Sequence, residues 1–491
     1  MKHPILCLIA LVAIVITTTL HSSDAIKEEP LILPDKIKQD FNQLYDQLQK
    51  SHINLFANRD KPAYDHLFEH TLQKLDAPLT PLQAQILFQK FTAAGDIAHA
   101  NIAFPNEAYT SYRESNGTAF PIYVEIIDGR WFTTLDYSSH NLVKGTEILT
   151  IQGVDVTDLF KTLKAHISAD TDAIASSLLE FQLPQYLWLI DIENSRFTKE
   201  FNLTIVQNQI RKSIIVKALS KDQLLASKTV ESNPTKNESK IREFATLKDN
   251  ISYLRPGPFY NAEDIDNLWD NSQFTQFIDD AFAHFIDTES KQLIIDLRNN
   301  PGGNNSFSDH LIAWFATEPF KFASTFLVKS SLQAKLSNEQ RLNDISDDNS
   351  ASHQLAKRYE KTPFGETFEF PIPLTNPRKG RRYEGEVYVL IDRHSYSNAA
   401  SVAAITQDYG FGIIAGEATT DFATTYASME TFTLKHTNIE VGFPKAHIIR
   451  PSGTIEPGPV EPELVLDKLN DEDDPMLQRL ISLLQYRIRG G

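Results

Sequence analysis

The sequence is short of cysteine, of long hydrophobic runs and of positive charge. Its 491 residues include one cysteine, Cys7, which excludes a disulfide framework, a cysteine-ligated zinc site and an iron–sulfur cluster. No segment after residue 25 is long and apolar enough to span a membrane, so we expect no stable membrane insertion. Lys and Arg total 47 against 64 Asp and Glu, and the resulting net charge of −17 disfavours nucleic acid as a partner.

Residues 1–25 have the pattern of a secretory signal peptide. Lys2 precedes an apolar run over residues 4–16, and small and polar residues follow it as far as Ala25. This pattern predicts a secreted or periplasmic protein that is cleaved near Ala25. The apolar run is shorter than the roughly 20 residues that a membrane span needs, and an uncleaved N-terminal anchor is the alternative interpretation.

The rest of the chain changes character three times, as expected for the two to four domains that its length predicts at about 100–200 residues each. Apolar residues at helical spacing predict a helical domain over 26–115, with one helix starting at a Thr80 cap. Short β-rich runs between Gly, Asn and Asp turns follow over 116–216, and a polar stretch predicts a linker over 217–245. From residue 246 to 491, strands and helices alternate, which predicts an α/β domain.

A buried strand, Leu293–Leu297, runs into the sequence Asn299-Asn300-Pro301-Gly302-Gly303. Glycines allow a sharp turn and let backbone N–H groups approach a ligand oxygen closely. The turn can therefore form an oxyanion hole, and the alternative is a strand that simply ends in a tight turn.

A second strand, Val387–Ile391, leads through a turn with two serines, Ser395 and Ser397, into a helix of small residues. A serine at a strand-to-helix turn can present its Oγ next to free backbone N–H groups and the positive end of the helix dipole. The alternative is that Ser395 or Ser397 only caps the helix.

In this order, the two segments resemble the tail-specific or carboxyl-terminal processing serine peptidases. That family has a crotonase-like catalytic core, of the ClpP/crotonase type, and usually a PDZ-like domain. Residues 144–156 are themselves similar to a glycine-containing segment of PDZ-like domains. The resemblance implies a multidomain α+β fold: an N-terminal helical domain, a PDZ-like β-rich domain and a crotonase-like α/β catalytic domain.

The resemblance also implies roles for individual residues. Aligning Gln407-Asp408 and Gly416-Glu417 with the family pattern makes Ser397 the nucleophile. The backbone N–H groups of Asn398 and of Gly302 or Gly303 would then form the oxyanion hole.

The general base departs from the commonest pattern of the family. Many members have a Ser–Lys dyad, but the lysine position falls at Phe422. A second branch resembles Ser–His–Glu enzymes, and the segment from Gly95 to His99 is similar to its Gly-Asp-x-His motif, with one additional residue. This implies that His99 is the base and that Glu456, after a Pro-x-Gly turn, orients its imidazole. Three further acids and one further base are also candidates: Asp96, Glu461, Glu463 and Lys445.

We therefore expect a serine endopeptidase that cleaves protein or peptide substrates through an acyl-enzyme, with no cofactor and no metal. Two different functions stay open. The segment His66-Leu67-Phe68-Glu69-His70 has the spacing of an inverted zinc-protease motif, with two imidazoles on one helix face. A catalytically inactive ligand- or peptide-binding protein on the same scaffold would explain the missing lysine.

Overall fold

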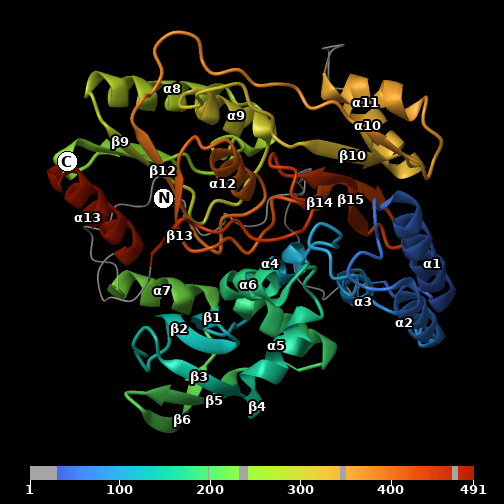
Figure 1. Ribbon diagram of the computed structural model, residues 1–491. Coiled ribbons are helices and arrows are strands. Elements are labelled where there is room, and N and C mark those ends of the chain that lie inside the picture. The colour runs from blue at the N-terminus through green and yellow to red at the C-terminus, as the bar shows by residue number, and fades with distance from the viewer. Residues whose placement is uncertain (1–29, 197, 232–240, 343–349, 467–473, 491) are drawn as a thin grey trace.

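The computed structural model describes residues 30–196, 198–231, 241–342, 350–466 and 474–490. Figure 1 shows three parts: N-terminal helices in blue, a β-rich part in cyan and green, and a larger α/β part in yellow to red. The predicted signal peptide, residues 1–25, lies outside the described residues. Within these ranges, no helix has both the length and the apolar character needed to cross a membrane.

The N-terminal part is helical, as predicted, and it shares a core with a sheet from the other end of the chain. Its helices are α1 (Pro34–Ser51), α2 (Lys61–Gln73), α3 (Pro81–Ala93) and α4 (Asn106–Glu114). The predicted cap of α3 is confirmed, because Thr80 Oγ1 accepts the N–H of Gln83 and Gln83 Oε1 accepts that of Thr80. Phe41 of α1 and Phe443 of β15 (Glu440–Ile449) belong to one hydrophobic cluster. The N-terminal helices are therefore anchored on the C-terminal half of the chain.

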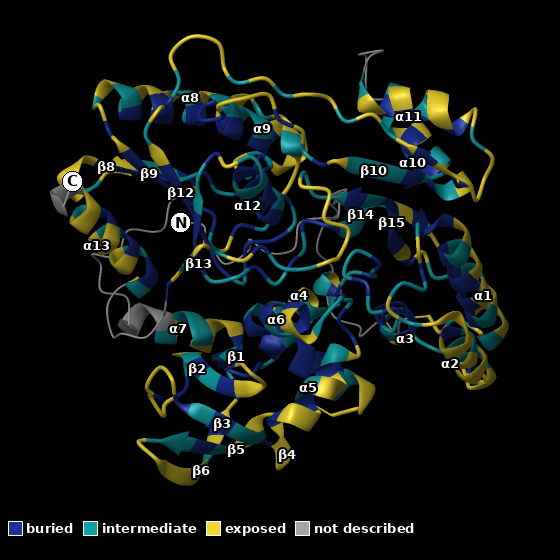
Figure 2. Ribbon diagram, in the orientation of Figure 1, coloured by how far each residue is buried: buried dark blue, intermediate teal, exposed yellow. Residues whose placement is uncertain are grey.

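The β-rich part is an antiparallel sheet covered by two helices. Its strand order is β1-β2-β3-β5-β6, with β4 paired to β3. The strands are β1 (Ile122–Ile127), β2 (Arg130–Asp136), β3 (Glu147–Ile151), β4 (Val154–Asp155), β5 (Glu200–Gln207) and β6 (Ile210–Lys217). The helices are α5 (Val156–Lys164) and α6 (Asp172–Glu193), and most of α6 is buried (Figure 2). Helix α6 is apolar on most faces because it packs between this sheet and the α/β part.

The segment predicted as a linker, residues 217–245, has regular structure where it is described. It contains α7 (Lys221–Glu231) and the start of β7 (Glu243–Thr246). Helix α7 begins with a cap, since Ser220 Oγ accepts the N–H of Gln223 and Gln223 Oε1 accepts that of Ser220. The segment was predicted as a linker because its residues are mostly polar. The Ser220 cap, which marks a helix start, was not recognised.

The α/β part is built on a six-stranded sheet with the order β16-β13-β12-β9-β8-β7, parallel except at β7. Its other strands are β8 (Ile251–Arg255), β9 (Gln292–Asp296), β12 (Glu386–Ile391), β13 (Ile413–Gly416) and β16 (Leu464–Val465). Leu293 and Ile295 face the core of α8 (Ser272–Asp287), α9 (Asn305–Ala313) and α12 (Asn398–Asp408). Ile294 faces α13 (Pro475–Gly490) on the other side. The predicted buried strands and the α/β alternation are thus confirmed.

A second sheet, β11-β10-β15-β14, links this part to the N-terminal helices. Its remaining strands are β10 (Thr325–Lys329), β11 (Thr367–Glu369) and β14 (Thr425–Thr433), and its helices are α10 (Leu332–Leu342) and α11 (Ala351–Tyr359). Two short 3₁₀ turns, Lys248–Asn250 and Ile265–Asn267, complete the described elements.

Candidate active site

The two turns that carry the sequence motifs meet at one edge of the parallel sheet. Strands β9 and β12 are parallel neighbours, with Asp296 beside Leu390. Because parallel strands end at the same edge, the turn after β9 lies against the turn after β12. Tyr396 donates its backbone N–H to the carbonyl of Asn300 at 2.9 Å, which joins the turns directly.

Ser397 is positioned at the N-terminus of α12 in a strained conformation. Its φ is +50° and its ψ is −119°, which an L-residue adopts only where the surrounding structure holds it. The side chain is half-buried and makes no capping hydrogen bond, so Ser397 does not serve as a helix cap. Ser395 differs, because it is fully buried and its Oγ donates to the carbonyl of Leu297 at 2.8 Å. Of the two serines, only Ser397 can present its hydroxyl to a substrate.

The glycine turn is pressed against the first residues of α12. A Cβ added to Gly302 would lie 2.7 Å from both the Cβ of Ser397 and the backbone N of Asn398. A Cβ on Gly303 would lie 2.1 Å from the carbonyl oxygen of Phe259, so only glycine fits at either position.

The donors near Ser397 are not equally available. The N–H of Gly302 donates to Asn300 Oδ1 at 2.9 Å. Among the described residues, neither the N–H of Gly303 nor that of Asn398 has a hydrogen-bond partner. Two unpaired N–H groups beside a serine have the composition of an oxyanion hole.

His99 lies on a loop after α3 that is held from two sides. On one side, Asn101 exchanges backbone hydrogen bonds of 3.1 and 2.8 Å with Gly442 of β15. On the other side, Ala98 donates its N–H to Asp170 Oδ2 at 3.0 Å. The His99 ring is half-buried, and its Nδ1 is buried without a partner among the described residues. The loop is therefore fixed while the imidazole is left uncommitted.

Asp170 connects the histidine loop electrostatically with the serine turn. Burial is the largest cause that raises the pKa of Asp170 above its usual value. The nearby charge of His99 lowers that pKa, whereas the charge of Asp421 raises it. Asp421 is itself buried, and its Oδ2 accepts the backbone N–H of Ser397. His99 and Ser397 thus share a neighbourhood of two carboxylates, although no hydrogen bond joins their side chains within the described ranges.

Glu456 is not brought to His99 in this structure. It is exposed on the loop after β15, and within the described part of the chain it has no hydrogen bond to the imidazole. Of the further candidate acids, Asp96 pairs with Lys164 at 3.6 Å, and Glu463 accepts the N–H of Ile414.

Glu461, Lys445 and the two histidines of α2 do not build a site either. Glu461 accepts no hydrogen bond on its carboxylate within the described residues, and its backbone carbonyl accepts from Gln407. Lys445 is buried and forms an ion pair with Glu430. His66 and His70 stack on α2 with ring centroids 6.3 Å apart, and the described residues hold no group of three or more His, Cys, Asp or Glu that could bind a metal.

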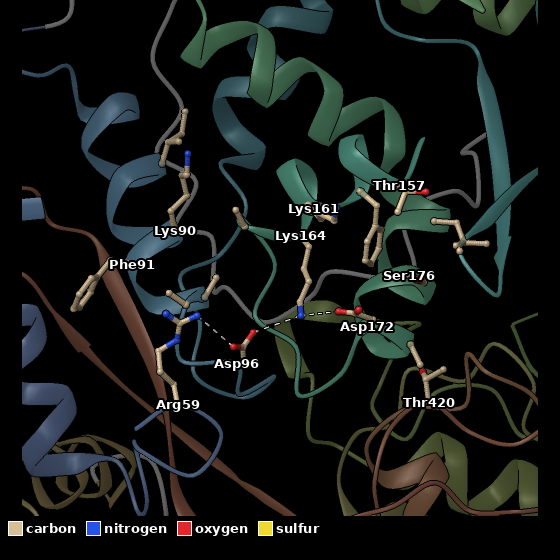
Figure 3. Close-up of a pocket in the computed structure, with 18 of the residues that line it drawn as sticks. Arg59, Lys90, Phe91, Asp96, Thr157, Lys161, Lys164, Asp172, Ser176 and Thr420 are labelled. Atoms are coloured by element: carbon tan, nitrogen blue, oxygen red, sulfur yellow. Dashed lines mark hydrogen bonds and ion pairs between the residues drawn. The ribbon is translucent and has the colours of Figure 1, made fainter. Parts of the chain in front are cut away.

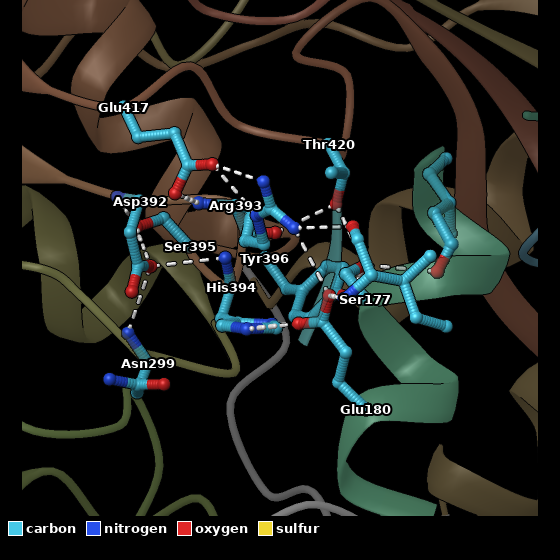
Figure 4. A network of polar contacts seen from close by, with 12 residues as sticks. Ser177, Glu180, Asn299, Asp392, Arg393, His394, Ser395, Tyr396, Glu417 and Thr420 are labelled. Atoms are coloured by element: carbon cyan, nitrogen blue, oxygen red, sulfur yellow. Dashed lines mark hydrogen bonds and ion pairs between the residues drawn. The ribbon is translucent and has the colours of Figure 1, made fainter. Parts of the chain in front are cut away.

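A polar network ties helix α6 to the serine turn (Figure 4). Glu180 of α6 contacts His394 Nε2 at 3.0 Å and Arg393 at 3.1 Å. Arg393 also pairs with Glu417 at 2.6 Å, and these charges hold the pKa of Arg393 above its usual value although its burial opposes the rise. Sequence reasoning missed Glu180, Asp170 and Asp421, since no local motif marks a carboxylate whose partner is distant in the chain.

Taken together, the parallel sheet, the strained serine at a helix N-terminus and the adjacent glycine turn define a serine-type hydrolase. The sequence profile of Peptidase family S41 matches residues 264–466, a range that contains Ser397 and the glycine turn. Over these residues the chain is therefore similar to peptidase family S41, a family of serine peptidases. A search of curated protein sequences found no match.

Comparison with solved structures shows a shared fold. Mature CPAF complexed with lactacystin has a TM-score of 0.61 and 17% sequence identity, with 88% of this chain and 94% of that chain covered. Mature CPAF alone has a TM-score of 0.61 and 16% identity over 88% and 93% of the two chains. The photosystem II D1 C-terminal processing protease is also similar, with a TM-score of 0.46 and 14% identity over 90% and 96%. The likeness to CPAF spans the helical N-terminal part and several sheets.

Proposed function

We propose that this protein is an exported serine endopeptidase that cleaves protein or peptide substrates through Ser397, His99 and Glu456. The observation that carries the proposal is the strained backbone of Ser397 at a helix N-terminus beside Gly302. The Ser397 hydroxyl makes no capping hydrogen bond there. A strand-to-helix turn of this kind exposes a nucleophile next to unpaired N–H groups.

The proposed reaction is acyl transfer in two halves. His99 takes the proton of Ser397 Oγ, and the oxygen attacks the carbonyl carbon of the scissile peptide bond. The N–H groups of Asn398 and Gly303 stabilise the tetrahedral oxyanion, and that of Gly302 can join them if it leaves Asn300. His99 then protonates the leaving amine. Water, deprotonated by His99, hydrolyses the acyl-enzyme and restores the serine.

The third member of the proposed triad requires a rearrangement. Glu456 is exposed here, so its loop has to move before the carboxylate can orient the imidazole of His99. Catalytic hydrogen bonds are often long or unformed in the absence of substrate, which makes such a movement consistent with the proposal.

The finer architecture and the location belong to the same proposal. We assign residues 246–491 as a crotonase-like catalytic domain and residues 116–216 as a PDZ-like domain, on the motifs at Gly302-Gly303 and at 144–156. The signal-like N-terminus supports a secreted or periplasmic location.

The test is the variant Ser397→Ala, assayed with a casein substrate and with a fluorophosphonate probe. We expect kcat to fall by about 10⁴-fold or more and labelling to disappear. The matched control is Ser306→Ala, an exposed serine on α9, which should keep both signals. Turnover and labelling that persist in Ser397→Ala would refute the nucleophile. A wild-type protein with neither signal would favour a catalytically inactive binding protein.

A further inference from the structure

A cavity of about 1250 Å³ lies where the three parts of the molecule meet (Figure 3). Helices α2 and α3 form one wall, and α5 and α6 form the opposite wall. The segment 417–420, which follows β13, closes a third side. A cavity of this size exceeds the usual range for a small ligand and can hold several residues of a peptide.

Two separate hydrophobic cores present half-buried side chains to this cavity. Leu67, Leu79 and Leu87 pack on the core that the N-terminal helices share with the second sheet. Phe160 and Ile192 pack on the core of the β-rich part. Ile86 of α3 joins the second core, but the half-buried side chains on the facing walls leave apolar area that a ligand can remove from water.

Each cation among the described lining residues is paired with an acid, whereas Asp128, also in the lining, is in no ion pair of the described residues. Lys90 pairs with Glu193 at 2.8 Å, and Lys164 pairs with Asp172 at 2.7 Å. Arg59 pairs with Asp96 at 3.7 Å. The two other described cations of the lining are also paired, Lys161 with Asp158 and Arg393 with Glu417. A ligand that depends on an unpaired cation, such as a carboxylate or a phosphate, finds none among the described lining residues. An apolar ligand does not need one.

The cavity borders both halves of the proposed catalytic site. Asp96, in its lining, lies on the loop that carries His99. Thr420, also in its lining, directly precedes Asp421, the acceptor of the Ser397 N–H. A polypeptide that occupied the cavity would therefore continue toward the serine.

We propose that this cavity binds an uncharged apolar segment of the substrate polypeptide, adjacent to the scissile bond. The proposal rests on the proposed function and adds a substrate class to it: chains with exposed Leu, Phe or similar residues, such as unfolded proteins. Since three parts of the molecule build the cavity, the β-rich part contributes to substrate selection.

The experiment measures binding without turnover. In Ser397→Ala protein, fluorescence anisotropy reports the Kd of a labelled decapeptide with two Leu and two Phe, against the same peptide with Ser at those four positions. We expect the apolar peptide alone to bind. Leu87→Asp and Phe160→Asp, on opposite walls, should each weaken it by about 10-fold or more, as expected for the loss of one apolar contact. Leu336→Asp, on α10 outside the cavity lining and 50% exposed, is the matched control and should bind like the parent.

The outcomes separate the inference from the proposed function. Circular dichroism melts check that the variants fold, and Leu87→Ala and Phe160→Ala serve if an aspartate variant does not. Equal binding of both peptides, or unchanged binding in folded variants of both walls, overturns the cavity proposal. Fluorophosphonate labelling of the wild-type protein tests catalysis separately. If the wild-type protein is not labelled but the apolar peptide binds and depends on both walls, the proposed function is overturned and the cavity proposal stands.

Discussion

Replacing Gly302 with alanine should damage catalysis far more than stability. The added Cβ would lie 2.6 Å from the carbonyl oxygen of Tyr396 and 2.7 Å from both the N of Asn398 and the Cβ of Ser397. These neighbours are backbone atoms and the first carbon of the nucleophile, so a flexible side chain cannot simply turn away. The turn has to separate from the start of α12, which moves an N–H donor relative to Ser397.

Two magnitudes follow from this geometry. Loss of one oxyanion donor lowers kcat by about 10²–10³-fold. The φ of Gly302 is +84°, and holding an alanine there costs roughly 1–2 kcal/mol of unfolding free energy. We therefore expect a folded protein with a large kcat defect.

The matched control for this prediction is Gly365→Ala. Gly365 has a φ of +94°, but its added Cβ would meet nothing within 4 Å. It carries the same conformational penalty without the contacts at the serine turn. We expect a smaller loss in urea-unfolding free energy than for Gly302→Ala, because no neighbour has to move, and an unchanged kcat on a fluorogenic peptide. The reasoning is refuted if folded Gly302→Ala keeps its kcat, or if Gly365→Ala loses as much activity.

Two other predictions concern the buried carboxylates. Glu180→Gln removes the charge that faces Arg393 and His394. We expect the unfolding free energy, measured in urea, to fall by about 3 kcal/mol and kcat to fall as well. An unchanged unfolding free energy would contradict the anchoring role of Glu180. Asp170 has a pKa raised by burial, so its contribution favours the fold below the unfolded-state pKa and is lost as the pH rises through the folded pKa. The unfolding free energy of Asp170→Asn relative to wild type should therefore be larger at about pH 7 than at about pH 4. A difference between variant and wild type that is the same at both pH values would contradict this.

The local parts of the site could be predicted from the sequence. Leu293–Ile295 and Val387–Ile391 are continuous apolar runs, and such runs specify buried strands of a parallel sheet. The Thr80 cap, the glycine turn and the serine turn are equally local, because their conformations depend on a few adjacent residues. These features marked the two turns, whereas the choice of Ser397 over Ser395 depended on the family resemblance, through Gln407-Asp408 and Gly416-Glu417.

The tertiary structure alone decided what surrounds them. The parallel pairing of β9 and β12 brings the two turns together, and the hydrogen bonds of Asn101 and Ala98 fix the His99 loop against β15 and Asp170. Asp170 and Glu180 come from a part of the chain where sequence reasoning found strands but no site residue. A motif constrains the backbone of its own segment, whereas contacts between distant segments depend on how whole elements pack, and no short pattern records that packing.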